Sequence, residues 1–285
     1  IWSYIVSAKF WNGSDWEYPE VYFWDGNDWV YLSGGDFYIY SGSRDSTVRK
    51  ISPNGSMIWR YAGHTEDVLA VAVDPSGYVY SGSWDDTVHK ISPDGSRVWS
   101  YPGYDGNVYA VAVDPLGYVY SGLAVSTVHK ISPSGSRIWI YREQSSVVEA
   151  VAVDSSGHVY SGSWDSTVHK ISPDGSRVWS YTGHSSDVEA VAVDPSGYVY
   201  SGSSDTTVHK ISLSGSRIWS YTGHSGAVRA VAVDPLGYVY SGSTDDTVHK
   251  ISPDGSRVWS YTGHSENVYA VAVDPGLYGA FPQYW

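Results

Sequence analysis

A segment of forty residues recurs along most of this chain. The unit from Tyr78 to Gly117 reads YVYSGSWDDTVHKISPDGSRVWSYPGYDGNVYAVAVDPLG, and a partial copy precedes it from Tyr38. Further copies begin at Tyr118, His158, Tyr198 and Tyr238. Self-similarity at this period is typical of repeat architectures, in which no single unit buries its own core. We therefore expect neighbouring copies to pack against one another.

Each repeat divides into four strand-like runs. The run 108–113 (VYAVAV) is apolar on both faces, as expected for an innermost strand. The second run begins at Tyr118, the third (TVHKIS) spans 167–172 in the next copy, and the outer run (SRVWSY) spans 176–181. Turn sequences such as DPLG and PDG separate the runs. Four short antiparallel strands joined by tight turns predict one blade of a β-propeller, and no helical periodicity competes with this reading.

Two short motifs resemble the repeats of WD-repeat propellers. They are the Gly-His before the inner strand, as at His64, and the Ser-Gly-Ser-x-Asp-x-Thr-Val at 81–88. The Trp-Asp that ends the third strand in that family is replaced here by Ile91 and Ser92, so we expect its hydrogen-bond network to lack the Trp. A Trp lies in the outer strand instead, which is similar to quinoprotein-type propellers: Trp59, Trp99, Trp139, Trp179, Trp219 and Trp259.

The blade count depends on how the two ends combine. Five blades are complete, at 68–100, 108–140, 148–180, 188–220 and 228–260. Residues 38–61 supply only the second to fourth strands of a blade, and residues 268–273 supply only a first strand. Pairing these two parts would close a ring of six blades and remove both free edges. We therefore predict an all-β fold, a six-bladed β-propeller of four-stranded antiparallel blades over residues 37–285, closed by its two ends.

The resemblance to WD repeats also implies a His in the loop before each blade opposite an Asp in a turn. These pairs are His64 with Asp85, His184 with Asp205, and His224 with Asp245. Blade 108–140 lacks both residues, and blade 148–180 has Gln144 in place of the His. The C-terminal His264 would then pair with Asp45, which favours one blade shared by the two ends.

Residues 1–36 differ from the repeats and are predicted to form a separate module. They contain KFWNGSDWEY from Lys9 and YFWDGNDWVY from Tyr22, each with an Asn-Gly or Asp-Gly pair between aromatic runs. This pattern predicts two β-hairpins. The motifs resemble short segments of phage and viral structural proteins, over less than a tenth of the chain. An alternative is a seven-bladed ring in which these hairpins complete another blade.

Composition excludes several classes of function. The formal net charge of −13 disfavours nucleic acid as a partner, since clustered Lys and Arg carry that binding. No apolar run is long enough for a membrane span, and the chain has no cysteine for a disulfide or a zinc–thiolate site. We expect no cofactor and no metal.

A recurring trio of His64, Ser81 and Asp85 has the composition of a hydrolase triad. The same trio appears in several blades, whereas catalysis needs one site, so we interpret it as a hydrogen-bond network that braces loops. A second set of histidines, each followed by a Lys, is predicted to make surface or inter-blade contacts: His89, His129, His169, His209 and His249. We predict that the protein is not an enzyme.

The repeats differ mainly at three positions, and these predict a binding face. One precedes the turn Asp, one precedes the first Val of the inner strand, and one follows that Val. Because strand direction alternates within a blade, all three positions should lie on one rim of the ring. The predicted partner-binding residues are Arg44, Trp84, Trp164, Asp67, Asn107, Asp187, Asn267, Leu69, Tyr109, Glu149, Glu189, Arg229 and Tyr269.

The function predicted from this pattern is non-catalytic recognition of a protein partner, because Trp, Tyr and Arg are common interaction anchors. An alternative is a glycan-binding or receptor-binding module, such as one on a virion, in which Trp and Tyr stack on sugar rings. Six equivalent sugar pockets would need uniform rim residues, and the rim residues vary. A protein partner is therefore favoured.

Overall fold

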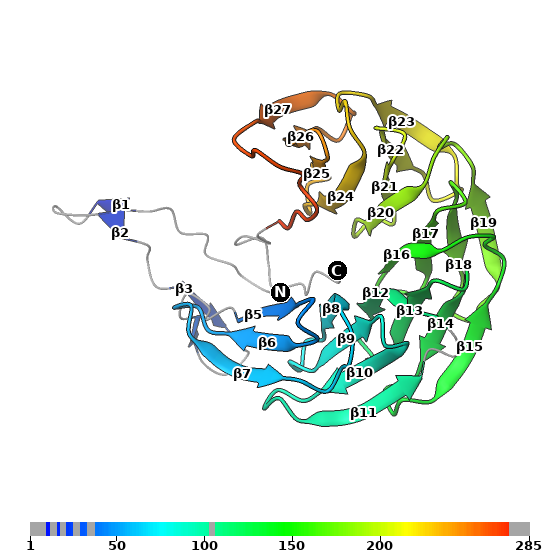
Figure 1. Cartoon of the computed structure of the whole chain (residues 1–285). Coiled ribbons are helices and arrows are strands. Elements are labelled where there is room, and N and C mark those ends of the chain that lie inside the picture. Colours follow the sequence, from blue (N-terminus) through cyan, green and yellow to red (C-terminus); the bar gives the residue numbers. More distant parts are fainter. Residues whose placement is uncertain are drawn as a thin grey trace.

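The computed structural model describes residues 38–102 and 106–273, together with four short strands between residues 10 and 32. Every regular element of these residues is a β-strand. No helix in the described part of the chain is long and apolar enough to cross a membrane. The strands form successive antiparallel sheets arranged radially around a common centre, as Figure 1 shows.

Five sheets have four strands each, in sequence order. Blade 2 contains β8 (Val68–Val73), β9 (Val79–Ser83), β10 (Thr87–Ile91) and β11 (Arg97–Pro102). Blade 3 contains β12 (Val108–Val113), β13 (Val119–Leu123), β14 (Val128–Ile131) and β15 (Arg137–Tyr141). Blade 4 contains β16 (Val148–Val153), β17 (Val159–Ser163), β18 (Val168–Ile171) and β19 (Arg177–Tyr181). Blade 5 contains β20 (Val188–Val193), β21 (Val199–Ser203), β22 (Val208–Ile211) and β23 (Arg217–Tyr221). Blade 6 contains β24 (Val228–Val233), β25 (Val239–Ser243), β26 (Val248–Ile251) and β27 (Arg257–Tyr261).

Blade 1 is a three-stranded sheet. It contains β5 (Ile39–Gly42), β6 (Val48–Ile51) and β7 (Met57–Tyr61), paired in that order. These are the second to fourth strands of a blade, as predicted from the sequence. The prediction of an all-β propeller with six blades is therefore confirmed, and the inner strand of blade 3 has the bounds of the predicted run 108–113.

Neighbouring blades pack through a glycine in the second strand of each blade. A Cβ atom at Gly82 of β9 would lie 2.5 Å from Cγ1 of Val108 in β12, and one at Gly202 of β21 would lie 2.7 Å from Cγ1 of Val228 in β24. Any larger residue would push the inner strand of the next blade away. The core lies between the blades, where Tyr80 and its equivalents Tyr120, Tyr160 and Tyr200 are fully buried.

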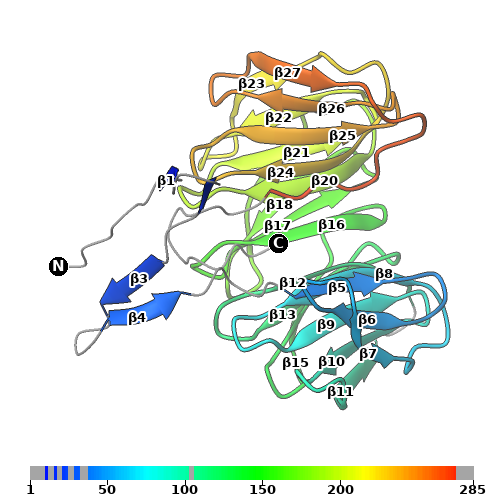
Figure 2. The ribbon, with the colours of Figure 1, turned by 90° about the vertical axis from the view of Figure 1, so that its left-hand side faces the viewer.

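The C-terminal residues 268–273 occupy the place of an inner strand beside blade 6. A Cβ atom at Gly242 would meet the Cγ1 atoms of Val268 and Val271, as Gly202 meets the corresponding valines of blade 6. The backbone N–H of Val268 donates to Ser243 O at 3.0 Å. The segment has no ladder to β5 in the described structure, and Figures 1 and 2 show the arc of blades open between blades 6 and 1. Pairing of the chain ends thus stays a prediction.

The N-terminal strands form two hairpins of their own. β1 (Phe10–Trp11) pairs with β2 (Trp16–Glu17), and β3 (Val21–Trp24) pairs with β4 (Trp29–Leu32), both antiparallel. The two predicted hairpins are confirmed at the backbone level. Neither is added to a blade among the described strands, so the structure does not support the seven-bladed alternative.

Candidate partner-binding face

The loop before each inner strand is hydrogen-bonded to the turn between the second and third strands. In blade 2 the N–H of Trp84 donates to Asp67 O at 2.9 Å, and in blade 4 the N–H of Trp164 donates to Val147 O at 3.0 Å. The same bond joins Ala124 to Asn107, Ser204 to Asp187 and Thr244 to Ala227. The residue before the turn Asp and the residue before the inner strand are therefore direct neighbours, on one rim.

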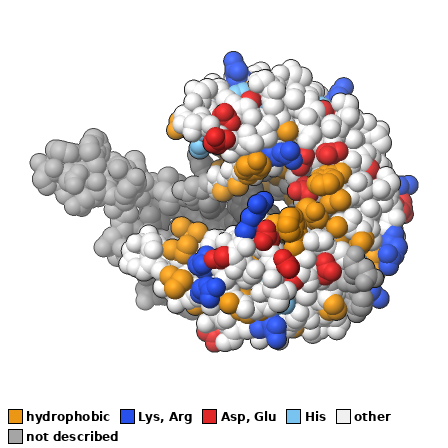
Figure 3. Space-filling view, viewed as in Figure 1, with side chains coloured by type: hydrophobic (Ala, Val, Ile, Leu, Met, Phe, Trp, Pro, Cys, Tyr) orange, Lys and Arg blue, Asp and Glu red, His pale blue; other side chains and the backbone are white. Residues whose placement is uncertain are grey.

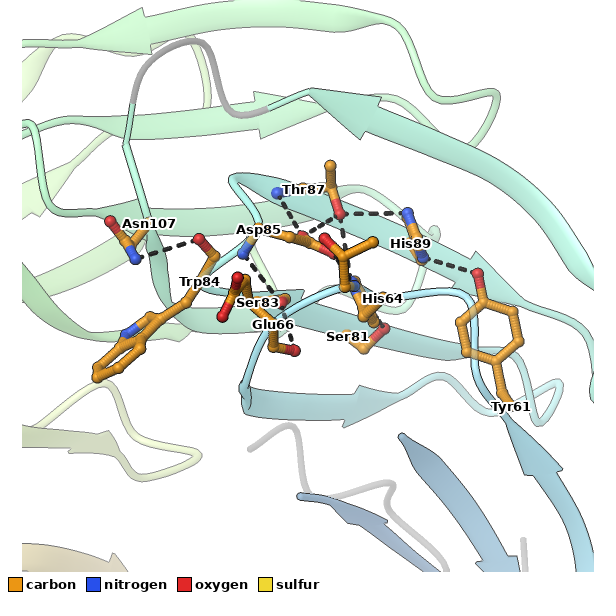
Figure 4. A network of polar contacts seen from close by, with 11 residues as sticks. Tyr61, His64, Glu66, Ser81, Ser83, Trp84, Asp85, Thr87, His89 and Asn107 are labelled. Atoms are coloured by element: carbon orange, nitrogen blue, oxygen red, sulfur yellow. Dashed lines mark hydrogen bonds and ion pairs between the residues drawn. The ribbon is translucent and has the colours of Figure 1, made fainter. Parts of the chain in front are cut away.

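A side-chain network holds this turn in place, as Figure 4 shows for blade 2. His64 lies 2.8 Å from both Ser81 Oγ and Asp85 Oδ2, and Thr87 Oγ1 donates to Asp85 Oδ1. Asp85 Oδ2 also accepts the backbone N–H of Thr65 at 3.0 Å. The same bonds connect His184 with Ser201 and Asp205, and His224 with Ser241 and Asp245. A carboxylate thus fixes the loop and the turn to each other.

One arrangement of protons satisfies the whole network. Ser81 O–H donates to His64 Nε2, and His64 Nδ1–H donates to Asp85. Burial alone would raise the pKa of Asp85, but hydrogen bonds from His64 and Thr87 hold that pKa well below its usual range. Burial, together with the adjacent His64 ring, lowers the pKa of His89 to about 3. The carboxylate is therefore ionised and His89 neutral at physiological pH.

The trio resembles a hydrolase triad in geometry but not in access. The side chains of Ser81, Ser201 and Ser241 are fully buried. A nucleophile must reach its substrate. These hydroxyl groups lie inside the blades, where each is hydrogen-bonded to the His of its own blade. The described bonds join the loop and the turn within a blade, and the bracing role stays a prediction.

Blades 3 and 4 show what happens when the His is absent. Ser121 Oγ and Ser161 Oγ, which are equivalent to Ser81, are buried without a hydrogen-bond partner among the described residues. Gln144 replaces the His of blade 4 and donates only to Ser161 O, at 3.3 Å. Asp165 of that blade still accepts the backbone N–H of Ser145. Tyr104, which replaces the His of blade 3, lies outside the described residues.

The second set of histidines makes inter-blade contacts. Tyr61 O–H of blade 1 lies 2.7 Å from His89 Nδ1 of blade 2, and the same contact joins each of the next four pairs of blades. Each neighbouring Lys lies over tyrosine rings of its own blade, as Lys90 does over Tyr78 at 4.3 Å. No group of three or more described His, Asp or Glu residues is placed to hold a metal ion.

The outer-strand Trp also joins blades. The indole N–H of Trp99 donates to Pro133 O of blade 3 at 3.0 Å, and its ring lies against Gly135 of the same turn. The equivalent bonds connect blades 1 to 2, 3 to 4, 4 to 5 and 5 to 6. The chain thus departs from the WD pattern in the position of its Trp. The Trp lies in the outer strand, where it stabilises the junction with the next blade.

The predicted face residues contact one another across blades 1 to 3. Arg44 forms an ion pair with Asp67 at 3.5 Å between Nε and Oδ2. The Asn107 side chain donates to Trp84 O at 3.2 Å, which links blade 3 to blade 2. The Trp84 side chain is 39% exposed, as is that of Trp164 two blades further. Both indoles therefore present an open surface on the rim.

Four adjacent inner strands carry a charged or aromatic side chain at their second residue, and we call this group the channel mouth. Its members are Tyr109 of β12, Glu149 of β16, Glu189 of β20 and Arg229 of β24. Arg229 Nη1 lies 2.5 Å from Glu189 Oε1, and Ser204 Oγ donates to the same oxygen. Figure 3 shows hydrophobic, basic and acidic side chains gathered around the central hollow on the face that it views.

The remaining predicted residues lie on blades 1 and 2 and in the C-terminal segment after β27. Tyr269 is 66% exposed and accepts a hydrogen bond from Asn267 at 3.0 Å. Leu69 is half-buried on β8. His264 is exposed and contacts Tyr261, whereas Asp45 bonds with Thr47 and Arg49, so the predicted pair of His264 and Asp45 is not formed among the described residues.

Sequence reasoning missed the ion pair between Glu189 and Arg229. Opposite charges at the same position of consecutive repeats were visible in the sequence and could have indicated it. It also missed the contact of Tyr109 with Trp164, whose rings lie 6.1 Å apart edge to face. Both contacts connect side chains of neighbouring blades, so the variable positions form one surface and not separate turns.

The opposite face is uniform. Asp74 Oδ1 accepts the N–H groups of Ser76 and Tyr78, and Tyr80 O–H donates to Asp74 Oδ2 at 2.9 Å. The same bonds recur at the corresponding turns of the next four blades, around Asp114, Asp154, Asp194 and Asp234. That face repeats the same side-chain bonds in five blades, whereas the exposed residues of the variable face change from blade to blade.

Two families of repeats match parts of the chain. The model described as "Outer membrane protein assembly factor BamB" matches residues 105–227, and the one described as "WD domain, G-beta repeat" matches residues 55–90 and 215–250. None of the curated proteins matches the chain. With the six blades described above, these matches identify a β-propeller built from WD-like and quinoprotein-type repeats.

Proposed function

We propose that this propeller is a non-catalytic scaffold that binds a protein partner through its variable rim. The observation that carries the proposal is the contrast between the two faces. The turn around Asp74 repeats from blade to blade, whereas the residues around Trp84, Trp164 and Glu189 differ and contact one another across blades. A surface built from different residues in each blade suits a composite protein epitope.

The matched families support this class of function. Propellers with WD repeats typically hold protein partners, and the other matching model is named for an assembly factor. The buried Ser81 hydroxyl also argues against hydrolysis by the recurring trio. In this proposal residues 1–36 form a module separate from the propeller of residues 37–285.

The test compares two double variants. Trp84→Ala with Trp164→Ala should abolish capture of a specific partner, identified first by cross-linking to the wild-type protein and then measured by calorimetry. Its melting temperature should stay close to that of the wild type, because both indoles lie at exposed turns. The control, Ser76→Ala with Ser196→Ala, changes turns of the opposite face and should bind normally.

Two results would contradict the proposal. Unfolding of the Trp double variant would show that these indoles belong to the core. Binding that survives in this variant but disappears when residues 1–36 are removed would assign recognition to the N-terminal hairpins. The exposed indoles favour a glycan ligand as the second candidate, and binding of the wild-type protein on a glycan array, lost in the Trp double variant, would select it.

A further inference from the structure

The mouth of the channel contains a carboxyl group with unmet bonding capacity. Glu149 Oε2 is buried and has no hydrogen-bond partner among the described residues, and the Trp164 side chain, which acts to lower the pKa of this carboxyl group, lies beside it. An unpaired buried carboxylate oxygen is costly to leave without a donor. The residue is therefore suited to a ligand that brings donors and positive charge.

Arg229 compensates this charge only in part: it acts to lower the pKa of Glu149, and its buried Nε has no hydrogen-bond partner among the described residues. Arg229 is engaged by Glu189, which is only 8% exposed, so these two largely neutralise each other. Asp187 adds a further negative charge near Glu149. Burial, reinforced by the Glu189 carboxylate, raises the pKa of Glu149 to about 7. The site thus has a net negative charge when Glu149 is ionised.

Aromatic side chains form the wall beside this carboxyl group. The Tyr109 and Trp164 rings lie edge to face, with centroids 6.1 Å apart, and the Trp164 side chain is 39% exposed. An indole face next to a carboxylate is a favourable environment for a planar cation, which stacks on the ring and donates to the oxygens. A guanidinium group could reach both oxygens of Glu149.

We propose that the channel mouth binds an arginine side chain of the protein partner, with Glu149 as its counter-ion and Trp164 as its stacking surface. This inference rests on the proposed function, and it names the chemistry that the partner must present. The groups that face Glu149 are Tyr109, Trp164, Asp187, Glu189 and Arg229. Of these, Arg229 is the only cation, and Glu189 already holds it.

The test uses N-acetyl-arginine methylamide as the probe and N-acetyl-citrulline methylamide as its neutral isostere. Binding is followed through the indole N–H resonance of Trp164, assigned with Trp164→Phe. We expect a saturable shift with the arginine probe only, and weaker binding at pH 6 than at pH 8 because Glu149 must be ionised. Glu149→Gln should weaken binding by about tenfold or more, since a charge-assisted bond is lost.

Glu143→Gln is the matched control. It makes the same change of charge in the loop that precedes β16, where Glu143 pairs with Arg177 at 2.7 Å, and it should bind the probe normally. Equal binding of the citrulline probe, or equal affinity in Glu149→Gln, would overturn the inference. A lysine probe that binds more tightly than arginine would overturn the assignment to a guanidinium group.

The outcomes also separate this inference from the proposed function. If the arginine probe does not bind while the Trp84 and Trp164 double variant still loses its protein partner, the inference is wrong and the scaffold function stands. If the probe binds through Glu149 but the Trp84 and Trp164 double variant still binds the partner normally, the arginine site is confirmed and the scaffold proposal fails.

Discussion

Two junctions contain nearly the same residues but differ in their contacts and in their exposure. One lies between blades 5 and 6, and the other lies between blades 6 and 1. At the first, Trp219 donates to Pro253 O at 3.0 Å and Tyr221 O–H lies 2.6 Å from His249. At the second, the equivalent Tyr261 has no such contact, and Trp259 is 42% exposed. Tyr221 is 6% exposed and Tyr261 is 52% exposed.

The comparison shows that a blade depends on the next blade for its buried surface. The open junction retains most of the required partners, because Pro53 stands where Pro253 does and Asp45 stands where Asp85 does. Arg49 takes the place of the inter-blade His. The exposed Tyr261 and Ile39, which is 57% exposed on β5, are the surfaces that a closed ring would bury. The following predictions test this difference.

Deleting residues 268–285 should have the largest effect. The deletion removes Val268 and Val271 from their contact with Gly242, and burial of each Val contributes about 1.5–3 kcal/mol. It also removes the segment that is predicted to complete blade 1. We expect a large fall in melting temperature, measured by circular dichroism. A truncated chain that melts as cooperatively and at the same temperature would refute closure by the chain ends.

Replacing the outer-strand Trp at each of the two junctions tests whether the junction between blades 6 and 1 closes in solution. Trp219→Ala should destabilise the fold by about 2–4 kcal/mol, because a packed ring and an inter-blade hydrogen bond are lost. Trp259→Ala should lower the free energy of unfolding far less if the junction between blades 6 and 1 stays open as in this structure. Equal losses in urea unfolding would instead show that Trp259 is packed against Pro53 and that the ring is closed.

Removing the carboxylate of one bracing network should have an intermediate effect. Asp205→Ala leaves the His184 ring, the Ser185 N–H and the Thr207 hydroxyl without their acceptor, at a cost of about 1–3 kcal/mol. Because hydrogen bonds lower the folded-state pKa of Asp205, its contribution is complete above the ordinary carboxyl range. That contribution is lost as the pH falls through the lowered pKa.

Val125→Ala is the control for Asp205→Ala, since Val125 holds the same turn position in a blade without the His–Asp pair. Val125 is 42% exposed, so its truncation should change the free energy of unfolding by less than about 0.5 kcal/mol. Equal losses at the two positions in chemical denaturation would contradict the bracing role.

Glu149→Gln should have the smallest effect, and one that depends on pH. The pKa of Glu149 is raised to about 7 in the folded state, so its protonated form stabilises the fold below the ordinary Glu range. This contribution is lost as the pH rises through about 7. The variant lacks that loss, so we expect it to be more stable than the wild type by about 1–2 kcal/mol near pH 8. The two proteins should have equal stability below about pH 4, as thermal unfolding would show.

Much of the fold could be predicted because its information is local. The run 108–113 coincides with β12, and the predicted third strand at 167–172 exceeds β18 by one residue at each end. Apolar periodicity and turn residues act within a few positions of the chain, and a forty-residue repeat states them several times. The neighbourhood of the variable positions also followed from strand direction alone.

The contacts that decide the candidate site could not be predicted in the same way. Glu149, Glu189 and Arg229 are forty residues apart in sequence, and only the radial arrangement of β16, β20 and β24 brings them together at one mouth. Burial of the Glu149 carboxyl group and the nearby Glu189 carboxylate raise its pKa, and both depend on the packing of neighbouring blades. The sequence by itself therefore determined the blades and the positions that vary between them, but it left both six and seven blades open. Tertiary structure alone decided which side chains on that rim are buried, paired or left without a partner, because desolvation and hydrogen bonding depend on neighbours that the local chain does not specify.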